Sequence, residues 1–143
     1  MQAVRSLSLI HLALIAGQVV FIAVVLVLNG NYEIILQPKD DLFFFIVPGF
    51  AVMSLITSNM IFKKMTEPIK MTLHLSEKLG KYRSACIVRY ALIEGPSLFA
   101  IISYYMSGNL FYIFISGFCI LYLFTLRPTR LKVEMDIQAQ LPS

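Results

Sequence analysis

The chain has 143 residues, of which 58% are hydrophobic and 14% are charged, and its formal net charge is +4. A soluble domain of this size buries only part of its surface, so that much apolar surface needs lipid to cover it. The composition therefore excludes a soluble globular enzyme. It predicts an all-α integral membrane protein, with residues 1–143 forming a single membrane domain.

Four apolar segments are long enough to be membrane-spanning helices, because a bilayer core of about 30 Å needs about 20 residues per helix. We predict these helices at Leu7–Leu28, Leu42–Phe62, Ser84–Met106 and Leu110–Leu126. The first segment is longer than a signal-peptide core, and no small-residue cleavage site follows it. We therefore expect it to remain as a helix. The four segments leave no room for a soluble catalytic domain.

The stretch Ile69–Tyr82, which lies between the second and third helices, follows Pro68 and mixes apolar residues with lysines. It is either an amphipathic helix at the membrane surface or the beginning of the third helix, which would then project from the membrane. The second alternative is favoured.

Basic residues are distributed unequally over the loops. Those between the second and third helices are Lys63, Lys64, Lys70, Lys78, Lys81 and Arg83, and the tail adds Arg127, Arg130 and Lys132. The loop between the first two helices has Lys39 against three acids, and the turn before Leu110 has no charge. The positive-inside rule predicts an inner-membrane protein with both termini and the central loop in the cytoplasm. The same cations suit contact with anionic lipid headgroups, and no nucleic-acid-binding motif is present, so no nucleic acid is expected as a partner.

The two halves of the chain resemble each other. The segment from Ile10 matches the segment from Val88 at Ala13/Ala91, Leu14/Leu92, Ile15/Ile93, Gly17/Gly95, Phe21/Phe99, Gly30/Gly108 and Asn31/Asn109. Chance would give about two such identities at this composition. The next helices match at Leu42-Phe43/Leu110-Phe111, Gly49-Phe50/Gly117-Phe118, Leu55/Leu123 and Thr57/Thr125.

This internal repeat predicts a membrane four-helix bundle made of two helical hairpins. The first hairpin covers residues 5–64 and the second covers residues 84–127. A cytoplasmic loop at 64–83 joins them, and a tail at 128–143 follows. Both hairpins begin and end in the cytoplasm, so the repeats are parallel and related by an axis along the membrane normal.

Glycines and prolines in the apolar segments suggest how the helices pack. Gly17 and Gly95 are equivalent in the repeat, as are Gly49 and Gly117. Small residues let helix backbones approach closely in lipid, so we predict these four glycines at helix crossings. Prolines at positions 48 and 96 remove backbone hydrogen bonds and are expected to kink the second and third helices.

Glu94 is the ionisable residue that lies deepest in an apolar segment, and such residues are candidates for function. On a helix, Tyr90, Ser97 and Tyr104 share its face, which we expect to point into the bundle. Tyr90 is placed to donate a hydrogen bond to the carboxyl group. The other candidate neighbours are Arg89, which is close in sequence, and His11 and Gln18, which belong to the first helix.

Two interpretations of Glu94 remain open. It is either a hydrogen-bonding group between helices that fixes the fold, or a binding site for a proton, a cation or a basic ligand, with the same neighbours in support. The sequence has no His/Cys/Asp/Glu cluster with the spacing of metal ligands, so neither a metal nor a cofactor is predicted. Cys86 and Cys119 are expected to be small apolar core residues, and His11 a structural residue.

Two resemblances to known families rest on the region around Glu94. The stretch Ala91–Gly95, with Phe99 after it, resembles the helix of rotary ATPase c subunits in which a membrane glutamate carries the transported ion. That resemblance implies ion binding at Glu94. More of the chain is similar to a group of small uncharacterised four-helix bacterial membrane proteins. They share an Arg-x-Ala-x-x-Glu-Gly pattern, which is RYALIEG at Arg89–Gly95 here, and a closing Leu-Arg-Pro-Thr, which is Leu126–Thr129 here. This resemblance implies four helices and no particular activity.

No catalytic residues are expected, because intramembrane proteolysis would need paired aspartates, a Ser–His dyad or a zinc motif. We therefore expect a non-enzymatic membrane protein that acts through helix association, as a homo-oligomer or as an accessory subunit of a larger membrane complex. The alternative is a proton- or cation-linked transport component that uses Glu94.

Overall fold

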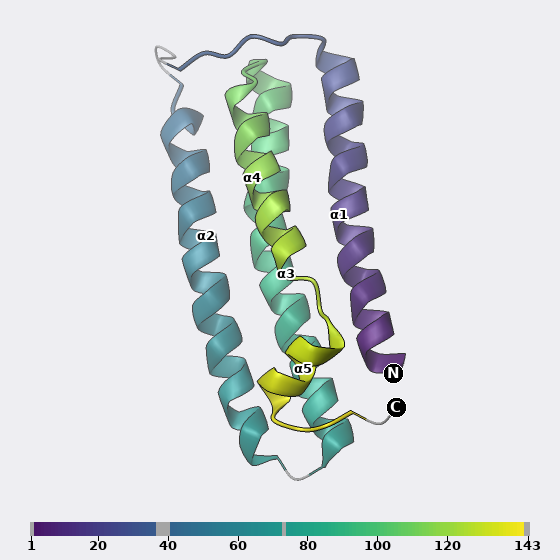
Figure 1. Ribbon diagram of the computed structural model, residues 1–143. Helices are drawn as coiled ribbons and strands as arrows, with labels where there is room; N and C mark the ends of the chain where they lie inside the picture. Colours follow the sequence, from purple (N-terminus) through teal and green to yellow (C-terminus); the bar gives the residue numbers. More distant parts are fainter. Residues whose placement is uncertain (1, 37–40, 73, 142–143) are drawn as a thin grey trace.

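The computed structural model describes residues 2–36, 41–72 and 74–141, and these residues are almost entirely helical (Figure 1). The α-helices are α1 (Gln2–Asn29), α2 (Phe43–Thr66), α3 (Leu75–Ser107), α4 (Phe111–Thr125) and α5 (Arg130–Ile137), and a 3₁₀ helix, η1, covers Glu67–Met71. The described part of the chain has no β-strand, only an isolated bridge between Glu33 and Asn109. The all-α prediction is confirmed.

Three of the helices, α1, α2 and α3, are long and apolar enough to cross a membrane. The fourth, α4, reaches the required length only together with α5, from which it is bent by 75°. With 15 residues, α4 alone is about 22 Å long, which is less than the apolar thickness of a bilayer. The structure therefore has three or four candidate membrane spans, and helices of this kind indicate a membrane protein.

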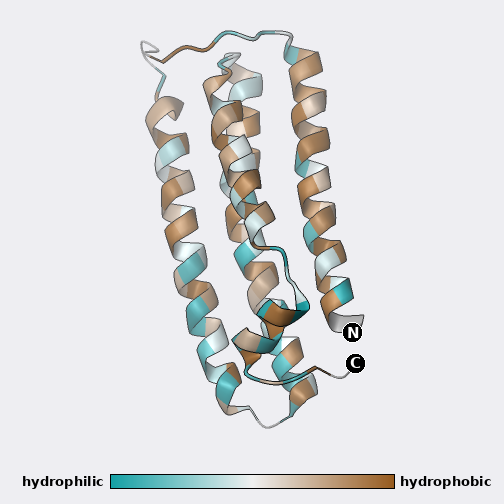
Figure 2. Ribbon diagram, viewed as in Figure 1, coloured by the Kyte–Doolittle hydropathy of each residue, from teal (hydrophilic) through white to brown (hydrophobic). Residues whose placement is uncertain are grey.

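Helix α3 is the centre of the structure. It packs against α1, α2 and α4, whereas α1 and α2 lie on either side of the α3–α4 pair (Figure 1). Segment 31–36 and the turn between α3 and α4 lie at one end, here called the turn end. The first residues of α1, the α2–α3 connection, α5 and residues 138–141 lie at the other, here called the terminal end. Hydrophilic residues (teal) are more frequent near the terminal end, and hydrophobic residues (brown) dominate the helices elsewhere (Figure 2).

Helix α3 begins at Leu75, well before the apolar segment predicted from the sequence. Residues 75–83 are therefore the beginning of a 33-residue helix and not a separate surface helix. The expectation that this stretch leads into the third helix is confirmed for residues 75–82, whereas Ile69–Met71 belong to η1. Helices α2 and α3 also continue without a break through Pro48 and Pro96.

The prediction that four glycines mark helix crossings is wrong within a single chain. A Cβ atom added at Gly17, Gly49, Gly95 or Gly117 would meet no other group within 4 Å. The first three of these glycines are exposed on the outer surface of their helices, and Gly117 is half-buried. The matching positions in the repeat indicated which residues are alike, but not towards which side of the helix they point.

The turn end is held by hydrogen bonds between segment 31–36 and the α3–α4 turn. Asn109 exchanges two hydrogen bonds with the backbone of Ile35, at 3.0 and 2.8 Å, and the backbone of Leu110 donates to the Glu33 carbonyl at 2.8 Å. The hydroxyl of Tyr104 donates to the Asn31 carbonyl at 2.6 Å. These bonds replace water for backbone groups that would otherwise be unpaired.

Helices α1 and α3 end in the same way, on a glycine with positive φ. Gly30 has φ +64° and Gly108 has φ +72°, and glycine reaches this left-handed region without strain. At Gly108 a Cβ atom would also lie 2.6 Å from the Asn31 side-chain amide nitrogen, so that side chain would have to shift. Glycine at this position lets the chain reverse direction between α3 and α4 without backbone strain.

Candidate functional site

Glu94 lies in the third turn of α3 after Cys86, about 20 Å from Ser107 at 1.5 Å per residue, and so within the apolar part of the helix. Its side chain is half-buried, at the border between the packed face and the outer face of α3. Ile93 beside it is fully packed, whereas Ala91 and Gly95 are exposed. Tyr90, Ser97 and Tyr104 are buried as predicted, but Glu94 does not point fully into the bundle.

The predicted partners of Glu94 bond elsewhere. The Tyr90 hydroxyl donates to the Leu126 carbonyl at 3.3 Å. The prediction that it donates to Glu94 is therefore wrong. Tyr90 is also in ring contact with His11, with centroids 5.0 Å apart. Among the residues that the structure describes, no side chain or backbone group donates a hydrogen bond to the Glu94 carboxyl group.

His11 and Tyr90 cap the end of α4. Helix α4 stops at Thr125, beside the middle of α3, and the last carbonyl groups of any helix lack partners within the helix. The Nε2–H group of buried His11 donates to the Leu123 carbonyl at 2.7 Å, and Tyr90 satisfies the Leu126 carbonyl. Because a carbonyl oxygen only accepts, this bond fixes the proton on Nε2. His11 therefore joins α1 to the end of α4, as expected of a structural residue.

Arg89 belongs to a separate polar group between α3 and α2. Its guanidinium donates to the Asn59 side-chain oxygen and lies 4.5 Å from the centre of the Phe62 ring. The Tyr122 hydroxyl also donates to that oxygen, at 3.0 Å, so α4 joins the same group. Arg89 is therefore directed towards α2, and the expectation that it pairs with Glu94 is wrong.

A second polar layer lies deeper in the bundle. Ser97 and Ser116 are completely buried and share a hydrogen bond of 2.8 Å between α3 and α4. Gln18 of α1 is only 1% exposed, and neither its amide nitrogen nor its amide oxygen has a hydrogen-bond partner in the described part of the chain. A buried amide without partners is costly, because it has lost its hydrogen bonds to water.

The register of α1 and α3 places Gln18 near the level of Glu94. The two helices run in the same direction (Figure 1), His11 meets Tyr90, and Asn29 donates to the carbonyl groups of Tyr104 and Tyr105. Counting along both helices from these contacts sets Gln18 opposite the stretch 93–97. The fully buried Gln18 amide and the half-buried Glu94 carboxyl group, which both lack hydrogen-bond partners among the described residues, therefore lie at about the same depth.

The described residues give little support to a metal site or to a functional role for the cysteines. Within them, no group of three His, Cys, Asp or Glu residues could hold a metal ion. Cys86 and Cys119 are both buried and unpaired, in the positions of small apolar core residues. Sequence reasoning missed Asn59 and Ser116, because the sequence does not reveal which helix faces which.

No family model, curated protein or solved structure matches the chain in the comparisons made with known proteins.

Proposed function

We propose that the chain is a small non-enzymatic protein of the inner membrane that acts by associating through its helices. Its partner is a second copy of the chain or a larger membrane complex, of which the chain is an accessory subunit. We further propose that α4 acts as the fourth span of a bundle of two parallel hairpins. The excess of Lys and Arg in the central loop and the tail supports a cytoplasmic position for the terminal end.

The observation that carries this proposal is the half-buried Glu94 carboxyl group, which has no hydrogen-bond partner among the described residues. A charged carboxylate deep in a membrane costs about 2.5–3.5 kcal/mol on insertion scales. A hydrogen bond from another chain would reduce that cost. Exposed Ala91 and Gly95 lie beside it, and small residues allow a second helix to approach closely.

Gly95→Leu tests the association. A Cβ atom at this exposed position meets no other group within 4 Å, so the larger side chain would extend outward and push a partner helix away from α3. We expect the wild-type protein to leave native membranes in mild detergent as a defined oligomer or stoichiometric complex, measured by native mass spectrometry. The variant should remain folded and lose at least about tenfold in bound partner, since displacing a packed helix costs more than about 1.4 kcal/mol.

The matched control is Ala23→Leu, which adds similar bulk to the exposed surface of α1. This control should keep the complex. A wild-type protein that emerges as a monomer without a partner would contradict the proposal, and so would equal losses in the two variants.

A proton- or cation-linked transport component is the second candidate, and the position of Gln18 favours it. An unpartnered amide at the depth of Glu94 offers a second polar group for a proton relay or a bound cation. Intramembrane carboxyl groups of this kind commonly mark such pathways.

Ion flux separates this candidate from association alone. Reconstituted in liposomes, the wild-type protein should conduct protons or a monovalent cation, and Glu94→Gln should abolish the flux while leaving the oligomeric state unchanged. The variant keeps the size of the side chain and one oxygen that accepts hydrogen bonds, but it cannot ionise. Absence of flux in the wild-type protein, or an unchanged flux in the variant, would eliminate the transport candidate.

A further inference from the structure

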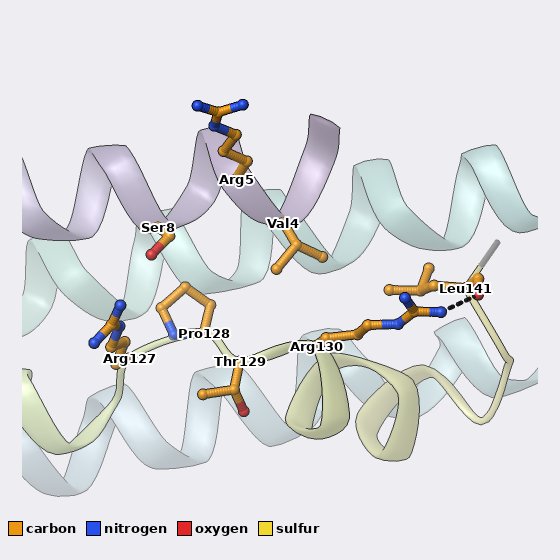
Figure 3. Close-up of a pocket in the computed structure, with 8 residues that line it drawn as sticks. All are labelled: Val4, Arg5, Ser8, Arg127, Pro128, Thr129, Arg130 and Leu141. Carbon is orange, nitrogen blue, oxygen red and sulfur yellow. Dashed lines mark hydrogen bonds between the residues drawn. The ribbon is translucent and has the colours of Figure 1, made fainter. Parts of the chain in front are cut away.

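A cavity of about 410 Å³ lies at the terminal end, between the first turns of α1 and the segment that connects α4 to α5 (Figure 3). Its lining residues are Val4, Arg5, Ser8, Arg127, Pro128, Thr129, Arg130 and Leu141. They come from α1, the α4–α5 linker, the first residue of α5 and the tail. Ligand sites commonly have volumes in this range.

The wall of the cavity carries a net positive charge. Arg130 pairs with Glu134 at 3.0 Å and donates to the Leu141 carbonyl at 2.6 Å. The pKa of Glu134 lies below its usual range because the Leu141 backbone N–H and then Arg130 donate hydrogen bonds to its carboxylate. Glu134 is therefore ionised at neutral pH and balances Arg130. Arg5 and Arg127 are exposed and have no acidic partner among the described residues.

The arrangement of these charges suits an amphiphile better than a small free anion. In Figure 3 the guanidinium groups of Arg5 and Arg127 point away from that of Arg130 and do not converge on one point. A site for inorganic phosphate needs several donors directed at the same group. Here the cations lie around a surface that is largely apolar, formed in part by Val4, Pro128 and Leu141.

The cavity also lies at the depth where lipid headgroups are expected. Arg127 follows directly after Leu126, where the apolar run of α4 ends. The bond from His11 to Leu123 sets the level of α1 against α4, and Ser8 and Arg5 lie one and two turns further towards the terminal end. The cations thus occupy the layer just beyond the apolar helices, where arginines meet lipid phosphates.

We propose that this cavity binds an anionic phospholipid, with the apolar part of the lipid against Val4, Pro128 and Leu141 and its charged headgroup at the rim, among the arginines that surround this surface. The site is independent of Glu94 and of the association proposed above. A lipid bound there contacts α1, the linker and the tail together.

Titration of the detergent-solubilised protein with phosphatidylglycerol tests the proposal, with bound lipid counted by native mass spectrometry. The double variant Arg5→Gln/Arg127→Gln should bind it roughly 30-fold more weakly, since each arginine at a membrane surface contributes about fivefold. Neither side chain makes a hydrogen bond in the described structure, so folding should be preserved, and an unchanged melting temperature checks this.

The matched control is Lys63→Gln/Lys64→Gln, which removes two exposed cations from α2 at the same end of the molecule. Binding in this control should change by no more than about twofold, because these lysines do not line the cavity and the attraction between charges falls off with distance. Equal losses in the two double variants would overturn the pocket assignment. Equal binding of phosphatidylcholine with the same acyl chains would contradict the proposal that the site recognises the negative charge of the lipid. Displacement of the lipid by excess inorganic phosphate would show that the site binds a free anion and not a lipid.

Discussion

Replacing Ile137 with alanine is expected to lower the free energy of unfolding by about 2–5 kcal/mol. Ile137 is fully buried, and Val133 of the same helix is 1% exposed. These two residues anchor α5 in the core cluster that also contains Leu7 and Tyr82. Removing the Ile137 side chain leaves a void where α5 meets the rest of this cluster.

Polar contacts at the same place increase the expected effect. Buried Lys78 donates to the Ile137 carbonyl at 3.1 Å, and the Tyr82 hydroxyl donates to the Asp136 carboxylate at 2.8 Å. A shift of α5 after the substitution would weaken both bonds and leave the Lys78 ammonium poorly satisfied. Unfolding in detergent micelles, followed by thermal melting or by titration with a denaturing detergent, measures the change.

Leu131 provides the control, because it lies in the same helix and is 67% exposed. Leu131→Ala should change the stability by less than about 0.5 kcal/mol. If Ile137→Ala were as mild as Leu131→Ala, α5 would not be packed against the bundle as described.

Replacing Gln18 with leucine is expected to stabilise the protein by about 1–3 kcal/mol. The amide is 1% exposed, and both of its polar atoms lack partners in the described part of the chain. Leucine has a similar volume and no polar groups, so it removes the desolvation cost without leaving a large void. Most substitutions of buried residues destabilise, so a gain in stability here would be diagnostic.

Ser116→Ala is the contrasting variant. It removes one partner of the buried Ser97–Ser116 hydrogen bond and leaves the other hydroxyl unsatisfied, so it should destabilise by about 1–3 kcal/mol. If Gln18→Leu also destabilised the protein, Gln18 would have a polar partner that the chain itself does not supply. A bound water, a cation or a residue of another chain could be that partner.

The sequence predicted the long helices well, because a membrane-spanning helix needs a long apolar run, which can be seen in the sequence. It placed the ends of α4 to within one residue, since Leu110–Leu126 was predicted and Phe111–Thr125 is observed, and Arg127-Pro128 suits this end because the residue before proline disfavours helix. It was wrong in counting this 15-residue helix as long enough to span a membrane alone. It did not predict that residues 130–141 would fold back and bury Val133, Ile137 and Leu141.

The candidate site was predicted only in part, for a related physical reason. Spacing of three or four residues identifies which side chains share a helix face, and it correctly grouped Tyr90, Ser97 and Tyr104. It cannot identify competing partners on other helices. Carbonyl groups at the end of α4 accept hydrogen bonds from Tyr90 and His11, and the Asn59 side chain of α2 accepts one from Arg89. Glu94 was found by its rarity in an apolar run, but its neighbours depended on the packing.

The shortness of α4 has a consequence for the surrounding lipid. Helices α1, α2 and α3 have 28, 24 and 33 residues, whereas α4 has 15. The apolar wall that the protein presents is therefore lower along α4 than along the rest of its circumference. Hydrophobic mismatch is relieved by deforming the bilayer, at fractions of a kcal/mol per Å. We expect the leaflet at the terminal end to be thinned beside α4, which would favour short acyl chains along that one side.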